Sequence, residues 1–366
     1  MTEIQALWNR AIALHGEAQY REALECLRAI EGRMPGDPRL LSNLGVVLRD
    51  SGDLASAERY FRRVISKLPG DAAAHFNLAL TLLRAGRLRE GFVEYEWRWH
   101  VPQFAPQRRE FAQALWRGEP LAGRRILLWS EQGAGDGIQF VRFAPLVRAA
   151  GGNVVLEMLP HIERLTTWME GGFPVGNALT PGVKFDVHCP LMSLPQRFGT
   201  DLGSIPAPAR FDVPAELVSK WAARLRTRRA NIGLVWATNP AYGNNAARSA
   251  PASLFAGIEC WGLQVGPSAG ETPDGVVNLG EELVDFAETA AAISALDLVI
   301  TVDTAVAHLA GSLGKPVWVL LHYASDWRWL LDREDTPWYP TMRLFRQRRP
   351  GDWGEVVARV RRELQQ

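Results

Sequence analysis

The sequence predicts an α-helical repeat solenoid followed by two α/β halves, each built on a parallel sheet. A pattern that returns every 34 residues near the amino end indicates stacked helical hairpins. From residue 118 onward, short apolar runs alternate with amphipathic segments, which is typical of parallel strands linked by helices. A chain of 366 residues is long enough to bury the cores of two or three such domains.

The repeat becomes visible when the chain is shifted by 34 residues. Asn43 then falls on Asn77 and Gly52 falls on Gly86, and small residues recur where two helices would cross. Together with a closing proline, this pattern resembles tetratricopeptide repeats, about three of them, and we assign them to residues 1–105.

One column of the repeat has a candidate function. Asn9, Asn43 and Asn77 recur on the first helix of each repeat, the helix that lines the concave surface of such solenoids. An amide offers a donor and an acceptor, so a ladder of amides can hold the backbone of an extended peptide acceptor. The alternative is that asparagine is simply common at this position of the repeat.

Composition excludes several classes of protein. The 41 basic and 40 acidic residues leave a formal charge of +1, so the chain lacks the positive field that nucleic-acid binding needs. Cys26, Cys189 and Cys260 lie too far apart for a CxxC metal or redox site, and their odd number disfavours a disulfide framework. Neither a leader peptide nor an apolar run long enough to span a membrane is visible. We expect a cytoplasmic protein that binds no nucleic acid and has no membrane span.

The α/β part divides at a proline-rich stretch into a first half, 106–212, and a second half, 213–350, with a last helix over 351–366. Ligands of such folds bind where parallel strands end, so we expect a cleft between the two Rossmann-like halves. The expected helices are 135–150, 215–229, 285–296, 304–313 and 352–364. The expected strands are 125–130, 153–159, 185–189, 231–237, 258–265, 276–279, 298–302 and 316–321.

A glycine-rich turn follows the first expected strand. Gly135 and Gly137 flank Asp136, and such glycines let a ligand approach backbone N–H groups at a helix start. The turn is not a dinucleotide fingerprint, because Ile138 stands where the last glycine would be. Two interpretations of Asp136 remain open, a catalytic base or acceptor ligand and a helix-capping aspartate, with Glu131 as the next candidate base.

Polar residues also follow two strands of the second half. Asp303 comes directly after the strand 298–302 and is the expected N-cap of the next helix, on which His308 lies. The loop 237–249 follows the strand 231–237 and contains Asn239 and Arg248. A guanidinium binds phosphate in a bidentate manner, so Arg248 is a candidate phosphate ligand. The alternatives are that Arg248 is an ordinary surface arginine and that His308 is a histidine packed in the core.

These segments together resemble a known family. Asp303-Thr-Ala-x-x-His308-Leu-Ala, followed by Gly314-Lys-Pro, resembles the C-terminal motif of the lipopolysaccharide heptosyltransferases, the family 9 glycosyltransferases, and Gly135-Asp136 resembles their N-terminal motif. The whole of residues 106–366 is similar to the glycosyltransferase-like domain of bacterial proteins that carry tetratricopeptide repeats in front of it. The stretches that carry this second resemblance are 91–99, 248–251, 326–331 and 337–340.

The resemblance implies a GT-B fold and inverting transfer of a sugar from a nucleotide-sugar, with Asp136 deprotonating the acceptor. It implies no metal and no cofactor besides the donor substrate, with helix N-termini and cations neutralising the leaving diphosphate. The protein acceptor would be presented by the repeats. The implied donor-binding residues are Asn239, Arg248, Ser249, Asp303, Thr304, Ala305 and His308.

Two alternative functions remain. The first is a repeat adaptor whose glycosyltransferase-like domain is degenerate, because Val265 stands where related proteins often carry a lysine that could hold phosphate. The second is a transferase acting on a glycan or lipid precursor. Four aromatic residues near the expected cleft could stack on a sugar or simply pack in the core: Trp327, Trp329, Trp338 and Tyr339.

Overall fold

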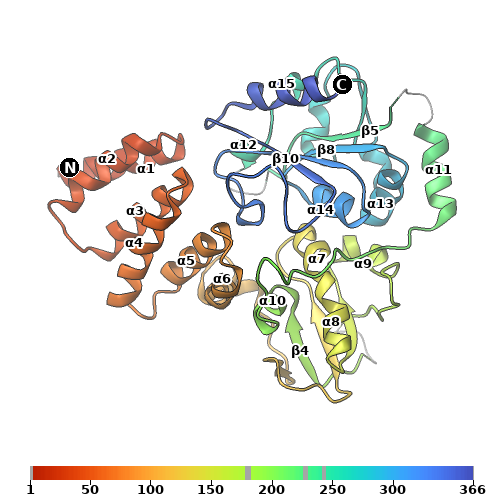
Figure 1. The fold of residues 1–366 in the computed structure, drawn as a ribbon, viewed down its shortest axis with the longest axis horizontal. Coiled ribbons are helices and arrows are strands. Elements are labelled where there is room, and N and C mark those ends of the chain that lie inside the picture. Colours follow the sequence, from red (N-terminus) through yellow and green to blue (C-terminus); the bar gives the residue numbers. More distant parts are fainter. Residues whose placement is uncertain (1–2, 178–182, 226–229, 241–244, 366) are drawn as a thin grey trace. The chain divides into compact units, whose positions relative to one another are not determined.

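The computed structural model describes residues 3–177, 183–225, 230–240 and 245–365, which fold as two compact units (Figure 1). The first unit comprises Met1–Arg108, Gly199–Ser204 and Tyr323–Asp332. The second unit comprises Arg109–Phe198, Ile205–His322 and Arg333–Gln366. The two short segments of the first unit therefore leave the α/β part of the chain and pack with the repeats.

The helices of the repeats pair in sequence order, and aspartates determine where several of them begin. Asp37, Asp53 and Asp71 each accept backbone N–H hydrogen bonds in the first turn of the helix that follows. The pairs are α1 (Glu3–Gly16) with α2 (Tyr20–Glu31), α3 (Pro38–Ser51) with α4 (Leu54–Lys67), and α5 (Ala72–Arg84) with α6 (Leu88–Tyr95).

The small residues of the repeat mark the helix crossings. A Cβ atom at Gly45 would lie 2.7 Å from the Phe61 ring, and a Cβ atom at Gly91 would lie 2.7 Å from the Leu83 side chain. Only glycine lets these helices approach so closely, so the 34-residue pattern reflects a packing requirement.

Two loops of the later chain complete the repeat unit. The Tyr323 ring stacks on Tyr20 with ring centroids 5.9 Å apart, and the Tyr323 hydroxyl donates a hydrogen bond to the Ser51 carbonyl oxygen at 3.2 Å. In the other loop, Asp201 forms an ion pair with Arg89 at 3.2 Å. The repeats therefore already bind two short turn segments of their own chain.

The first half of the α/β unit is a parallel sheet with the order β1-β4-β2-β3. Its core contains the fully buried Leu127, Leu128 and Phe140. Its strands are β1 (Ala114–Leu115), β2 (Arg125–Trp129), β3 (Asn153–Glu157) and β4 (Val187–Pro190). Its helices are α7 (Ala134–Phe140), α8 (Ala144–Ala149), α9 (Pro160–Thr166) and α10 (Leu194–Arg197).

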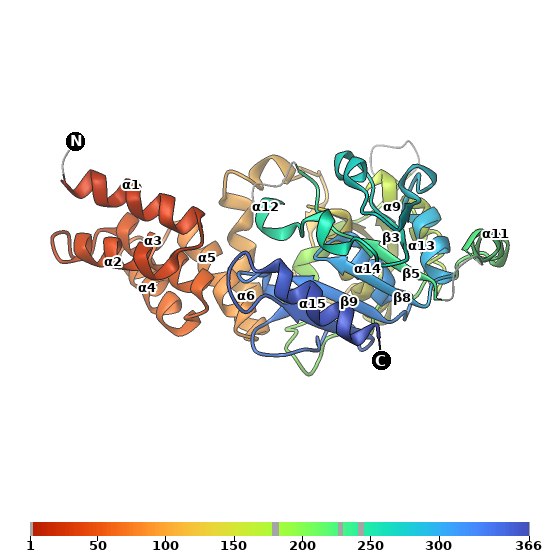
Figure 2. The same ribbon diagram turned by 90° about the horizontal axis from the view of Figure 1, so that it is seen from above.

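The second half is a parallel sheet with the order β10-β9-β8-β5-β6-β7. Its strands are β5 (Ile232–Val235), β6 (Cys260–Gly262), β7 (Val276–Asn278), β8 (Leu298–Val302), β9 (Val317–Leu321) and β10 (Met342–Arg346). Its helices are α12 (Asn245–Arg248), α13 (Phe286–Ser294), α14 (Ala305–Ser312) and α15 (Trp353–Glu363), and α11 (Ala215–Leu225) precedes it. Helix α15 packs on one face of the sheet through Val356 and Val360, and α13 and α14 lie on the other face (Figures 1 and 2).

The expected fold class, a repeat solenoid followed by two parallel-sheet α/β halves, is confirmed, with local differences. Strands β1 and β10 were not expected, because one has two residues and the other alternates arginines with apolar residues. The helix expected over 135–150 is broken after Phe140, since Pro145 in the first turn of α8 cannot continue a regular helix.

Strand order creates a switch point in each sheet. In the first sheet β2 is followed by β3 on one side and by β4 on the other, and in the second sheet β5 lies between β6 and β8. Crevices for ligands form at the carboxyl ends of strands at such points. A ligand site is therefore expected at the segments that follow β2, β5 and β8.

Candidate active site

The turn after β2 presents Asp136 in the first turn of α7. The Asp136 Oδ2 atom accepts a hydrogen bond from the Gly133 backbone N–H at 2.9 Å, and the side chain is half-buried. A carboxylate here is stabilised by the unpaired N–H groups and the dipole of the helix start. Asp136 therefore caps the helix, and its carboxylate remains partly accessible. Glu131, the second candidate base, is 4% exposed.

Polar side chains gather where β5 ends. Thr238 donates its hydroxyl hydrogen bond to Asn245 Oδ1 at 2.6 Å, and its backbone N–H donates to Ser249 Oγ at 3.0 Å. Asn239 follows and is exposed. These contacts hold both ends of the loop 237–249 at the switch point of the second sheet, while residues 241–244 of that loop lie outside the described part of the chain.

The neighbouring strand β8 is followed directly by Asp303, which binds Arg248. The guanidinium donates to the Asp303 carbonyl oxygen at 2.7 Å and lies 3.4 Å from its Oδ2 atom. Helix α14 begins at Ala305 with Thr304 at its N-cap position, one residue later than expected. The structure thus brings together the candidate donor-binding residues Arg248, Ser249, Asp303 and Thr304, which come from two separate stretches of sequence.

Helices α7 and α14 pack directly against each other and join the two candidate motifs. A Cβ atom at Gly135 would lie 2.9 Å from His308 Cδ2 and 3.3 Å from the Ala305 Cα atom. The glycine next to Asp136 therefore permits the close approach of the helix that carries His308. Residues of the first and second halves meet here at one place.

His308 is buried and contacts Tyr339, a residue that the sequence did not link to it. The Tyr339 hydroxyl lies 3.2 Å from His308 Nδ1, and the Tyr339 ring lies 4.5 Å from the Arg142 guanidinium. Arg142 was also missed by sequence reasoning. Its position in a largely apolar stretch, Ile138 to Leu146, was the only available signal.

The aromatic residues near the expected cleft are packing residues. Trp327, Trp329, Trp338 and Tyr339 are each at most 4% exposed, so none offers a ring face to a sugar. They also do not form one cluster, since the first two belong to the repeat unit and the last two to the α/β unit. The core-packing alternative of the sequence analysis therefore describes them.

The candidate acceptor-binding asparagines lie on α1, α3 and α5, as expected. Asn9 accepts a hydrogen bond from Gln5 at 2.9 Å, and Asn77 accepts one from Arg49 at 2.7 Å. The half-buried Asn43 makes no side-chain hydrogen bond with another described residue. Among the three amides, Asn43 is the one most available to a peptide.

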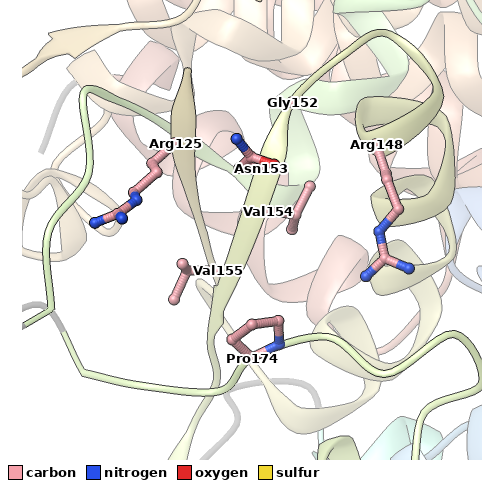
Figure 3. A pocket seen from close by; sticks show the side chains of 7 residues that line it. All are labelled: Arg125, Arg148, Gly152, Asn153, Val154, Val155 and Pro174. Carbon is pink, nitrogen blue, oxygen red and sulfur yellow. The ribbon is translucent and has the colours of Figure 1, made fainter. Parts of the chain in front are cut away.

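A pocket of about 280 Å³ lies away from these motifs (Figure 3). It is lined by Arg125 and Asn153, the first residues of β2 and β3, and by Arg148, which donates to the Gly171 carbonyl oxygen at 2.6 Å. It therefore lies at the amino ends of the strands, opposite the switch point.

Within the described residues, no group of three His, Cys, Asp or Glu side chains could hold a metal ion, and no helix is long and apolar enough to cross a membrane.

Comparison with known families decides what these motifs belong to. The family model named "Tetratricopeptide repeat" matches residues 9–72 and 43–96, and that named "Glycosyltransferase family 9 (heptosyltransferase)" matches residues 274–338. The chain thus carries tetratricopeptide repeats followed by a domain that is similar to the family 9 glycosyltransferases. The protein is therefore a glycosyltransferase, and the matched segment of its domain includes Asp303 and His308 but neither Asp136 nor Arg248.

Similar proteins include Protein FlbA of Caulobacter vibrioides, which is 26% identical over 432 residues, covering 98% of this chain and 72% of that protein. Among solved structures, the glycosyl transferase family 9 from Veillonella parvula has a TM-score of 0.46 at 12% identity and covers 69% of this chain and 92% of its own. The E. coli ADP-heptose lps heptosyltransferase II has a TM-score of 0.47 at 13% identity, covering 66% and 97%. The iron-containing dodecameric glycosyltransferase TibC from enterotoxigenic E. coli has a TM-score of 0.45 at 13% identity, covering 67% and 77%.

Proposed function

We propose that this glycosyltransferase moves a sugar from a nucleotide-sugar to a protein acceptor presented by the repeats, with inversion at the anomeric carbon and without a metal. One observation carries the proposal. The turn with Asp136 and the start of α14 each follow a strand at a switch point, and the two segments pack against each other through Gly135 and Ala305. A candidate base and a candidate diphosphate site therefore share one place.

The donor would bind where β5 and β8 end. The first N–H groups of α14 and the Arg248 guanidinium are suited to the charge of a leaving diphosphate. Asp303 contacts the Arg248 guanidinium, so a bound diphosphate would compete with this carboxylate for the guanidinium. Asn239, Ser249, Thr304 and Ala305 line the same strand ends and would contact the sugar and the phosphates.

The acceptor hydroxyl would lose its proton to Asp136. A carboxylate that keeps a hydrogen bond from Gly133 is fixed in orientation, and its half-burial leaves part of it accessible to an acceptor. Attack by that hydroxyl forms the new glycosidic bond while the bond to the diphosphate breaks. A base and a leaving group on opposite sides of the sugar would give inversion.

The repeats favour a protein as the acceptor, because they bind short turn segments of their own chain in this structure through Tyr20, Ser51 and Arg89. Incubation of the enzyme with a radiolabelled nucleotide-sugar and a cell extract separates the alternatives. Label in a protease-sensitive fraction supports the protein acceptor, whereas label only in the lipid extract would establish the lipid-precursor alternative. The adaptor alternative predicts no transfer at all.

The proposal needs no metal, since cationic and backbone groups would neutralise the diphosphate. The contrary possibility is a metal-dependent transfer, since the similar glycosyltransferase TibC is iron-containing. Transfer that persists after dialysis against EDTA supports the metal-free reaction. Transfer that stops and returns on adding iron would refute it. The three cysteines are buried, and we place the reaction in the cytoplasm.

The experiment that tests the function is a thermal-shift panel of nucleotide-sugars with the full chain. A ligand at 100 times its dissociation constant stabilises the folded state by about 2.7 kcal/mol, enough for a clear rise in Tm. A shift with one nucleotide-sugar and a smaller shift with its nucleoside alone supports the proposed donor site. If no nucleotide or nucleotide-sugar raises Tm, the degenerate adaptor becomes the better description.

A further inference from the structure

Tyr339 is fixed against the helix face that carries His308. The ring is fully buried, and a Cβ atom at Gly311 of α14 would lie 2.6 Å from Tyr339 Cδ1. His308 and Gly311 are three residues apart and thus on one side of the helix. The glycine makes room for the ring, and the ring places its hydroxyl 3.2 Å from His308 Nδ1.

Arg142 holds the other side of Tyr339. It follows α7 in the first half of the unit, it is 2% exposed, and its guanidinium donates to the carbonyl oxygens of Gln139 at 2.7 Å and Trp338 at 2.8 Å. Among the described residues no carboxylate forms an ion pair with it. A buried cation without a carboxylate is costly, so its position over the Tyr339 ring, 4.5 Å from the centroid, is informative.

Arg142 determines whether the Tyr339 hydroxyl donates a hydrogen bond to His308 or accepts one from it. Burial lowers the pKa of the guanidinium, while its interaction with Tyr339 raises it. The Arg142 cation lies over the Tyr339 ring and makes the hydroxyl a stronger hydrogen-bond donor, so the hydroxyl donates to His308 Nδ1. The neutral imidazole then carries its proton on Nε2.

The Nε2 side of His308 faces the turn that contains Asp136. Cδ2, the ring atom bonded to Nε2, would lie 2.9 Å from a Cβ atom at Gly135. We propose that Arg142 and Tyr339 are positioning residues that hold the Nε2–H of His308 toward this turn, as a donor to an oxygen of the nucleotide-sugar. Arg142 belongs to the first half and Tyr339 and His308 to the second, so the network is complete only when the halves meet. This inference rests on the proposed function.

The first test reads the tautomer of His308 and requires no substrate. The full chain, which has seven histidines, is labelled with ¹⁵N in the imidazole rings, and the His308 signals are assigned by their loss in His308→Gln. We expect a single Nε2–H tautomer in the wild type and a mixture of tautomers in Tyr339→Phe. Arg142→Gln, which removes the cation, should also give a mixture, and Arg142→Lys, which keeps a buried cation, should retain the single form.

A matched control is Tyr60→Phe, which removes a hydrogen-bonded hydroxyl in the repeats, where Tyr60 donates to Glu31 at 3.0 Å. The control should leave the His308 signals unchanged. A pure Nε2–H tautomer that survives in Tyr339→Phe would overturn the positioning role, because the hydroxyl would then not determine the proton's place.

The second test uses the nucleotide-sugar that gives the largest thermal shift. Tyr339→Phe should lower kcat for its transfer or hydrolysis by up to about 100-fold, the cost of a misplaced reacting group, while KM for the donor changes little. A changed tautomer with unchanged kcat would overturn the inference. If the wild type binds no nucleotide-sugar, the proposed function fails and so does this role of His308, whereas the first test separately decides whether Tyr339 orients the ring.

Discussion

The Asp136 carboxylate caps helix α7 and is also the base of the proposed reaction. Its Oδ2 atom accepts from the Gly133 N–H at 2.9 Å, an interaction that an amide oxygen can reproduce. Capping and catalysis therefore do not exclude each other, and they respond differently to substitution. Loss of the cap lowers stability, whereas loss of the basic oxygen lowers turnover.

Asp136→Asn should leave Tm and donor affinity nearly unchanged while kcat falls by about 100-fold or more, because the amide keeps the cap and cannot take a proton. Steady-state kinetics with the donor found in the thermal-shift panel measures this. Glu131→Gln, a change in a buried carboxyl of the same turn, is the comparison. Wild-type turnover in Asp136→Asn would remove this residue from the mechanism.

Arg248→Ala should weaken binding of a nucleoside diphosphate by about 10–150-fold and of the bare nucleoside hardly at all, since a charge-assisted hydrogen bond is lost. The variant should also have a lower Tm, because the buried Asp303 carboxylate no longer contacts the Arg248 guanidinium. The double variant Arg248→Ala/Asp303→Asn separates the effects. It should regain Tm and still bind the diphosphate weakly. Equal losses for nucleoside and diphosphate would show that Arg248 has only a structural role.

At the scale of elements, the contact between α7 and α14 depends on the absence of a side chain at Gly135. Gly135→Ala places a methyl group 2.9 Å from His308 Cδ2 and 3.3 Å from the Ala305 backbone. Overpacking of this kind costs about 1–3 kcal/mol, and it should lower turnover by displacing His308. Gly270→Ala, whose added methyl meets open space, is the matched control. Full activity in Gly135→Ala would show that turnover does not depend on the close contact between α7 and α14.

Substitution of Asn43 alone gives a cleaner test of acceptor binding than substitution of all three asparagines. Asn77→Ala would also remove its hydrogen bond with Arg49, whereas Asn43 has no such bond to a described residue. We expect Asn43→Ala to raise KM for a protein acceptor while donor affinity and donor hydrolysis stay the same. An unchanged KM for the acceptor would favour the alternative that asparagine is only common at this position.

At the scale of the whole molecule, contacts between the two halves of the α/β unit decide whether a site exists. Arg142 donates across the halves to the Trp338 carbonyl oxygen, and Arg164 of α9 pairs with Asp285 of α13 at 2.9 Å. Arg164 also lies 3.3 Å from the Glu288 carboxylate of α13. These contacts hold the motifs of the two halves together.

Stability of the whole fold should also fall in mild acid through His188. Burial, and secondly Arg109, lowers its pKa from 6.5 to about 4. The unfolded chain therefore binds the proton first, and the stability contributed by neutral His188 is lost as the pH falls from about 6.5 toward 4. Between pH 7 and pH 5, Tm should drop more in the wild type than in His188→Phe. Identical drops would contradict this assignment.

The sequence by itself determined those features that follow from local rules. The repeats were predictable because close helix crossings require small residues such as Gly45 at a regular spacing. The strands after which Asp136 and Asp303 follow were predictable as short apolar runs bounded by turn residues. The segments of the candidate site were found in this way.

Only the tertiary structure decided which of these segments touch. It placed Gly135 against His308, paired Arg248 with Asp303, buried Arg142 beside Tyr339 and packed Tyr323 on the repeats. Parallel strands and packed helices join residues far apart in the chain, and the free energy of such contacts depends on the complete arrangement rather than on any local pattern. For this reason one sequence could indicate the chemistry of the site while its internal connections had to come from the fold.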